Sequence, residues 1–143
     1  MTNSLTPFHL AILVSDLAKC RTFYRDVLNC SEGRSSEHWV DFNFFGHQLV
    51  LHQQHSDEAV KENISNPVDG HNVPVPHFGV VLEWETWNKL AENLKGHGIV
   101  FAIEPYTRFK GETGEQSTMF FYDPEGNALE FKSFKDFDQI FAK

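Results

Sequence analysis

The sequence predicts an α+β protein built from two βαβββ modules. The prediction rests on two apolar, strand-like runs that begin with histidine, one at His9 and one at His77. Each run is followed by a segment with apolar residues at helical spacing and then by further strand-like runs. With 143 residues, 41% of them hydrophobic, the chain has the apolar material for one domain. We therefore expect a single domain over 1–143, with module one at about 7–54, a linker at about 55–76, module two at about 77–132 and a C-terminal tail at 133–143.

The first module is expected to open with a strand over 9–14, followed by a helix capped by Ser15 or Asp16. Strands over 37–45 and 48–53 follow, and a short strand over 31–35 completes the βαβββ order. The helix is predicted from apolar residues at helical spacing, which are Leu17, Cys20, Phe23, Tyr24, Val27 and Leu28.

The second module repeats this order. A strand over 77–82 precedes a helix over 85–95, where Lys95 and Gly96 supply a cationic last turn and a glycine stop. Strands are expected over 100–109, 117–122 and 128–132. Between the modules, the polar segment 55–76 is interpreted as a solvated linker with one or two helical turns; the alternative is a loop that closes over a cleft.

Charge and composition exclude several classes of protein. The net charge is −8, with 20 acidic and 12 basic residues and no basic cluster, which argues against binding to nucleic acid. No apolar stretch approaches the roughly 20 residues that span a bilayer, and the first residues do not resemble a signal peptide. Cys20 and Cys30 lack metal or redox spacing, and Cys20 is expected on the buried face of its helix. A reducing, cytoplasmic location follows from this use of cysteine.

Two histidines and one carboxylate form a candidate metal site. His9 and His77 occupy the same position in the two modules, and Glu130 lies on the last strand of the second module. Two imidazoles and a carboxylate with further coordination positions free suit non-haem Fe(II) or a similar divalent ion, such as Mn, Zn or Ni. The alternatives are that the histidines are ordinary surface residues and that Glu130 faces water from an edge strand.

The chain resembles the vicinal oxygen chelate superfamily, also called the glyoxalase, bleomycin-resistance and dioxygenase group. The resemblance covers about residues 7–132, and its most specific part is the Asp-Pro-Glu-Gly-Asn turn at 123–127, which an acid follows three residues later. In that superfamily two modules each supply half of a curled sheet around a metal. The resemblance therefore implies a cup-shaped, eight-stranded mixed sheet, with His9, His77 and Glu130 as the metal ligands.

The number of ligands separates two branches of that superfamily. When the halves are aligned at Gly46 and Gly126, Val50 takes the position of Glu130. Glyoxalase I enzymes use a fourth ligand there, and valine cannot bind a metal. Three ligands resemble the extradiol dioxygenases, which implies Fe(II) and an O2-dependent reaction on a small vicinal diol or hydroxy-carbonyl. A glyoxalase-like lyase or isomerase and a drug-binding protein of the same fold are the alternatives.

Four further residues are candidates for catalysis and substrate binding. His52 is expected on the same strand face as Val50, and histidine is the residue type most often used for proton transfer, so it is a candidate acid–base group; an exposed histidine at a strand end is the alternative. Tyr122 is a weaker candidate to donate a hydrogen bond to substrate. Arg108 and Lys110 are candidates to pair with a substrate carboxylate, or else are solvated. Exposed sheet edges also predict a homodimer.

Overall fold

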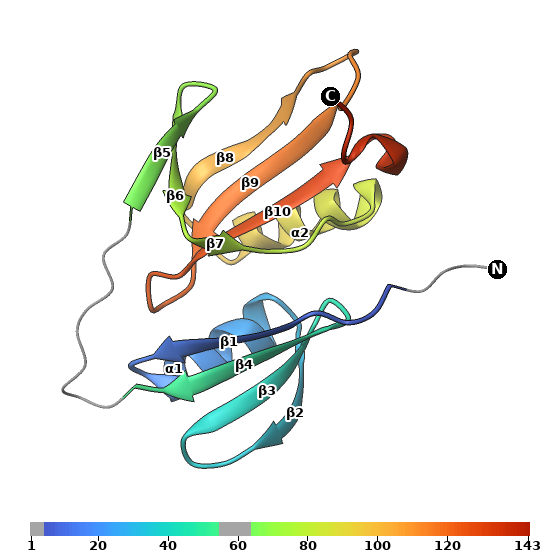
Figure 1. Cartoon of the computed structure of the whole chain (residues 1–143). Coiled ribbons are helices and arrows are strands. Elements are labelled where there is room, and N and C mark those ends of the chain that lie inside the picture. Colours follow the sequence, from blue (N-terminus) through green and yellow to red (C-terminus); the bar gives the residue numbers. More distant parts are fainter. Residues whose placement is uncertain (1–4, 55–63) are drawn as a thin grey trace. The chain divides into compact units, whose positions relative to one another are not determined.

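The chain folds into two compact units, each of which contains one of the expected modules (Figure 1). In the computed structural model, which describes residues 5–54 and 64–143, unit 1 comprises Met1–Val60 and unit 2 comprises Lys61–Lys143. Each unit has a four-stranded mixed sheet with a helix packed on one face. The predicted α+β fold with two βαβββ modules is confirmed.

Unit 1 follows the predicted order closely. Its four strands pair in the order β1-β4-β3-β2, with β1 parallel to β4 and the other neighbours antiparallel. The side chain of Asp16 caps the first helix by accepting from the backbone N–H of Lys19 at 3.0 Å. The elements are β1 (His9–Val14), α1 (Leu17–Thr22), the π-helix η1 (Phe23–Val27), β2 (Ser31–Ser35), β3 (Trp39–Phe44) and β4 (His47–Gln53). The predicted helix is thus present, but its second half is a wider π-helix rather than a continuation of α1.

The sheet of unit 1 has one apolar and one more polar face. Strand alternation directs Leu49, Leu51 and Phe42 to the core beside α1, where Cys20 and Tyr24 are fully buried. The opposite face carries His9, Asp41, Gln48, Val50 and His52, as the pairing register of β1, β3 and β4 requires. The candidate residues of this module therefore share the face that α1 does not cover.

Unit 2 contains the second module and an additional hairpin. Its main sheet has the order β7-β10-β9-β8, with β7 parallel to β10 and the other neighbours antiparallel. Its elements are β5 (Ile64–Val68), β6 (His71–Val75), β7 (His77–Phe78), α2 (Trp84–Gly96), β8 (Phe101–Arg108), β9 (Gln116–Tyr122), β10 (Ala128–Phe134) and the 3-10 helix η2 (Phe137–Gln139). Among the residues described, no helix has the length and apolar character needed to cross a membrane.

Helix α2 packs on one face of this sheet and leaves the other face to the candidate site. Its buried residues are Trp87, Leu90, Ala91 and Leu94. The indole Nε1 of Trp87 donates to the backbone carbonyl of Phe131 at 2.8 Å, which ties the helix to β10. Because side chains alternate along a strand, Glu130 points away from the face that Leu129 and Phe131 share.

The segment before β7 differs from its prediction. Residues 64–75 form the antiparallel β5–β6 hairpin, which the sequence interpretation did not include. The rest of the predicted linker, residues 55–63, lies outside the described part of the chain, so the helical turns expected within 55–76 stay a prediction. The loop residues Asp69 and Gly70 have φ values of 49° and 76°. An Asp-Gly pair with two positive φ values is a favoured two-residue hairpin loop, because its twist matches that of the flanking strands.

The strand predicted over 77–82 is regular only at His77–Phe78. Hydrogen bonds to β10 resume beyond it, since Leu82 N–H donates to the Lys132 carbonyl at 2.7 Å. The interruption falls at Gly79, where an added Cβ would lie 1.5 Å from the carbonyl oxygen of Glu130. Glycine is required here because the two backbones approach too closely for any side chain.

Candidate metal centre

His77 and Glu130 face each other in unit 2. The two strands that carry them are parallel neighbours, with His77 opposite Ala128, so Glu130 lies two residues farther along on the same face. His77 Nε2 and Glu130 Oε2 are 2.9 Å apart. The side chains are 29% and 14% exposed, so the pair is accessible but largely withdrawn from water.

The orientation of the His77 ring is fixed by its other nitrogen. Nδ1 lies 2.7 Å from the backbone carbonyl of Pro74, and because a carbonyl only accepts, Nδ1 carries a hydrogen. The ring of Phe120 also stands edge-on at 5.1 Å between centroids. The hydrogen bond with Glu130 raises the pKa of the His77 imidazole above its usual value, although burial acts in the opposite direction. Nε2 is thus directed at the carboxylate.

Glu130 is held at both carboxylate oxygens. The hydroxyl of Thr118, on β9, donates to Oε1 at 2.7 Å, while Oε2 faces His77. Burial tends to raise the pKa of Glu130, but the hydrogen bonds from His77 and Thr118 outweigh it and leave the pKa below its usual value. The positive charge of Lys132, two residues along the same strand face, lowers it further. The carboxylate is therefore ionised near neutral pH, as a metal ligand must be.

The donor atoms of this pair fit a divalent cation. In the metal-free pair the Nε2 hydrogen of His77 faces the carboxylate, and a bound cation would displace that proton. The neutral ring, with its hydrogen on Nδ1, then presents the Nε2 lone pair, and the ionised carboxylate supplies an oxygen. When two ligand atoms each lie about 2.1 Å from one ion and the ligand–ion–ligand angle is near 90°, the two ligand atoms are roughly 3 Å apart. The observed N···O distance of 2.9 Å agrees with that value.

His9 begins β1 of unit 1 and hydrogen bonds within that unit. Its Nδ1 lies 2.8 Å from the side-chain oxygen of Gln48, the residue opposite it on β4. Val50 is two residues beyond Gln48, just as Glu130 is two residues beyond Ala128. The register therefore supports the alignment of Val50 with Glu130. Within either unit, the residues that the structure describes bring together no group of three His, Cys, Asp or Glu side chains.

The two candidates for proton transfer lie on the faces that carry the predicted ligands. His52 pairs with Leu13 and Trp39 and is exposed on the same sheet face as His9 in unit 1. Tyr122 is 40% exposed and pairs with Ala128, which places it on the Glu130 face in unit 2. Both positions are accessible to a small molecule.

The two candidates for substrate binding differ in their surroundings. Arg108, on β8, forms an ion pair with Asp69 at the tip of the β5–β6 hairpin. The ring of His71 also contacts Tyr106 of β8, at 4.9 Å between centroids. The hairpin thus contacts β8 through one ion pair and one ring contact. Lys110 is exposed in the turn that follows β8.

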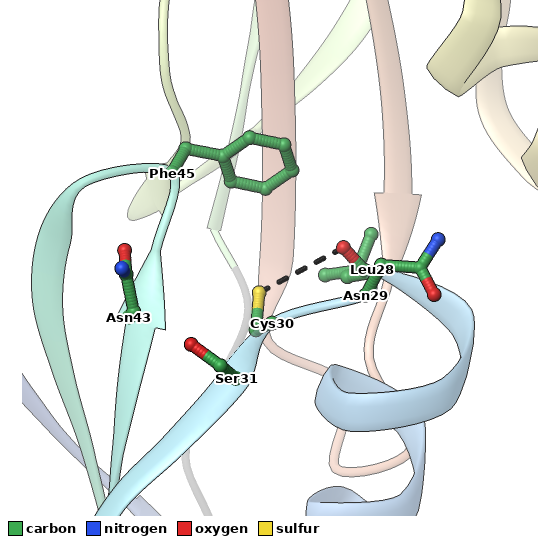
Figure 2. Close-up of a pocket in the computed structure, with 6 residues that line it drawn as sticks. All are labelled: Leu28, Asn29, Cys30, Ser31, Asn43 and Phe45. Atoms are coloured by element: carbon green, nitrogen blue, oxygen red, sulfur yellow. Dashed lines mark hydrogen bonds between the residues drawn. The ribbon is translucent and has the colours of Figure 1, made fainter.

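A hollow of 190 Å³ in unit 1 lies at the end of the helical segment (Figure 2). Cys30 lines it and directs its Sγ to the carbonyl of Leu28 at 3.8 Å. Burial raises the pKa of the Cys30 thiol to about 12, so the reactive thiolate is not formed near neutral pH. The Cys30 side chain therefore contributes to packing and is not a reactive nucleophile.

Comparison with known proteins identifies the family. Residues 6–131 match the Glyoxalase/Bleomycin resistance protein/Dioxygenase superfamily. The chain is 33% identical to a glyoxalase/bleomycin resistance protein/dioxygenase from Alicyclobacillus acidocaldarius of known crystal structure, with 99% of this chain and 100% of that chain covered and a TM-score of 0.78. The protein therefore belongs to this superfamily, whose members are mostly enzymes and often depend on a metal.

More distant structures share the fold. A genomically encoded fosfomycin resistance protein, FosX, from Listeria monocytogenes is 19% identical, with 97% of this chain and 98% of that chain covered and a TM-score of 0.65. Lactoylglutathione lyase from Agrobacterium tumefaciens is 16% identical, with 92% and 96% covered and a TM-score of 0.61. The same fold thus carries proteins with different names and activities.

Sequence reasoning missed the residues that hold the candidate ligands in place. Thr118, Gln48 and the carbonyl of Pro74 contact the three candidate ligands but belong to other strands. A cross-strand contact depends on the pairing register. The alternation of the strands alone indicates which residues share a face, not which ones touch.

Proposed function

We propose that the protein is a metal-dependent enzyme in which His9, His77 and Glu130 bind one divalent ion. The observation that carries this proposal is the approach of His77 Nε2 to Glu130 Oε2 at 2.9 Å, with the ring fixed by Pro74 and the carboxylate fixed by Thr118. An ordinary surface ion pair has no need for such support on both partners, whereas metal ligands usually have it.

The reaction that we propose is an O2-dependent one of the extradiol type on a small vicinal diol or hydroxy-carbonyl. The presence of valine at position 50, where the register matches Glu130, supports it because three ligands leave coordination positions for substrate. When bound, the ion supplies Lewis acidity to vicinal substrate oxygens and, as Fe(II), redox chemistry with O2. Mn, Zn and Ni are the other candidate ions.

The remaining candidate residues have supporting roles in this proposal. His52 or Tyr122 moves a proton to or from the substrate, since both are accessible on ligand-bearing faces. Arg108 and Lys110 attract a substrate carboxylate. Because Arg108 is paired with Asp69, an anionic substrate has to compete with that carboxylate, whereas Lys110 is exposed in its turn.

A glyoxalase-like lyase or isomerase is the second candidate function. It is favoured by the position of His52, which lies two residues beyond Val50 on the same sheet face and has the side chain to supply a fourth ligand. Small-molecule binding without catalysis is a third possibility, against which the retained ligand pair argues. A cytoplasmic location and a homodimer stay predictions from the sequence.

Metal content and O2 consumption distinguish these functions. The protein is purified without air, its metal is measured, and O2 uptake is followed with catechols and hydroxy-carbonyl compounds. Iron together with substrate-dependent O2 uptake supports the dioxygenase, whereas Ni, Zn or Mn without O2 uptake favours the lyase or isomerase. His9→Ala and Glu130→Ala should each lose most of the metal, and His97→Ala, at the exposed end of α2, should not. Full metal occupancy in both ligand variants would refute the assignment.

A second variant tests the number of ligands. Val50→Glu introduces a carboxylate at the position that matches Glu130. Because it would take a coordination position that the substrate and O2 need, we expect tighter metal binding and loss of O2-dependent turnover. Retained dioxygenase activity in this variant would count against the proposed reaction and leave the metal site itself unaffected.

A further inference from the structure

A chain of two hydrogen bonds ends at His9 in unit 1. His9 Nδ1 lies 2.8 Å from Oε1 of Gln48, and Nε2 of Gln48 donates to Oδ2 of Asp41 at 3.3 Å. The three side chains come from three adjacent strands, β1, β4 and β3, and share the face that α1 does not cover. Gln48 and Asp41 also line a hollow of 270 Å³ on this unit.

Asp41 determines which end of the Gln48 amide faces His9. A carboxylate only accepts hydrogen bonds, so the amide must turn its NH2 group to Asp41 and its oxygen to the imidazole. An amide oxygen also only accepts, so Nδ1 of His9 must carry the hydrogen. The neutral ring is then left with its lone pair on Nε2.

At His77 a different group holds the hydrogen on Nδ1. There the backbone carbonyl of Pro74 receives the Nδ1 hydrogen. Gln48 lies opposite His9, whereas Ala128 lies opposite His77 and has no polar group in its side chain. In both modules the histidine thus keeps its hydrogen on Nδ1, which leaves Nε2 as the nitrogen for a cation. The Gln48 side chain accepts that hydrogen in the first module, and the Pro74 backbone carbonyl accepts it in the second.

We propose that Gln48 and Asp41 are positioning residues that hold His9 in the tautomer and orientation that present Nε2 to a divalent cation. This inference rests on the proposed metal-binding function. A histidine ligand that is hydrogen bonded through its second nitrogen loses less rotational freedom on binding and is a stronger donor. Asp41 acts through Gln48, and neither residue needs to touch the ion or the substrate.

Two variants and one control test the relay. Gln48→Leu keeps the approximate size of the side chain but removes both hydrogen bonds. The double variant Gln48→Glu with Asp41→Asn rebuilds the relay, since the new amide at position 41 donates to the new carboxylate at position 48 and that carboxylate accepts from His9. Gln54→Leu is the matched control, the same substitution at a residue just after β4.

Two measurements distinguish the positioning of His9 from metal binding itself: the tautomer of His9 in metal-free protein and the affinity for Mn²⁺. Nitrogen-15 chemical shifts of His9 in metal-free protein, measured at about pH 8.5 where an ordinary imidazole is neutral, report the tautomer directly. We expect the Nδ1–H form in the wild type, the control and the double variant, and a mixture of both tautomers in Gln48→Leu. Affinity for Mn²⁺, measured by titration calorimetry, should fall roughly 10- to 100-fold in Gln48→Leu and recover in the double variant.

The outcomes are distinguishable. If the wild type binds Mn²⁺ and Gln48→Leu binds it equally well, or keeps the pure Nδ1–H tautomer, the positioning role is refuted while the metal site stands. If the wild type binds no divalent ion at all, including Fe²⁺, Zn²⁺ and Ni²⁺, the proposed function fails and the positioning role fails with it.

Discussion

Replacing Thr118 by valine tests whether the carboxylate of Glu130 is held in place for a ligand. The hydroxyl of Thr118 donates to Glu130 Oε1 at 2.7 Å, and the Thr118 side chain is buried. Valine has nearly the same shape, so the substitution removes the hydrogen bond and little packing. The pKa of Glu130 should rise as a result, because that hydrogen bond favours the ionised form.

The expected magnitude follows from the charge and exposure of the carboxylate. A hydrogen bond to an ionised group contributes about 1.5–3 kcal/mol. We expect a loss of stability near the lower end, about 1.5 kcal/mol, because Glu130 is 14% exposed and water can replace part of the bond. Metal affinity should fall roughly 10- to 100-fold, since the carboxylate then has to be ordered when the ion binds.

The assay combines urea denaturation of metal-free protein with calorimetric titration of Mn²⁺. Thr107→Val is the matched control, because the Thr107 hydroxyl lies 2.9 Å from that of Ser117 and forms a neutral hydrogen bond. That variant should lose some stability, about 0.5–1.5 kcal/mol, but keep its metal affinity. Equal Mn²⁺ affinity in the two threonine variants would refute the reasoning.

Two further predictions concern the same strands. Gly79→Ala should destabilise the protein by about 2–3 kcal/mol in urea denaturation, because its Cβ would lie 1.5 Å from the Glu130 carbonyl oxygen. Gly96→Ala is the control: its Cβ meets no atom within 4 Å, so this variant should be neutral or slightly stabilising. Equal stability of the two variants would contradict this prediction. In metal-free protein, the pair of His77 and Glu130 should contribute most to stability between the usual pKa values of 4.5 and 6.5. That contribution is lost as pH rises through the raised pKa of His77, and also as pH falls through the lowered pKa of Glu130. The difference in unfolding free energy between wild type and Glu130→Gln should therefore peak in this window. A difference that does not vary with pH would count against the assigned shifts.

Local patterns were sufficient for most of the fold. The strand over His9–Val14 and the short strand over Ser31–Ser35 have the predicted bounds, and α2 extends one residue beyond its prediction at each end. Apolar periodicity reports these elements because one face of each is buried. The β5–β6 hairpin was also predictable, because the Asp-Gly pair at its tip is a strong local signal for a hairpin turn. The segment was instead interpreted as a linker.

The candidate site was predictable in residue type but not in its contacts. His77 and Glu130 were singled out by the repeat and by their positions on strands, and they prove to be 2.9 Å apart. The assignment of His9 as their third partner stays a prediction. The shortening of β7 was not foreseen, because the contact of Gly79 with the Glu130 carbonyl joins residues about 50 apart in sequence.

Periodicity, turn signals and residue type are local properties, and they were enough to predict the α+β class, the two modules and the residues with ligand chemistry. The contacts that support those residues come from the tertiary structure. Thr118 reaches Glu130, the Pro74 carbonyl fixes His77, and Gln48 links His9 to Asp41. Each of these contacts depends on strand pairing or on the path of the backbone. Those are set by the packing of whole sheets, and a shift of one residue in register would direct every side chain of a strand to the other face.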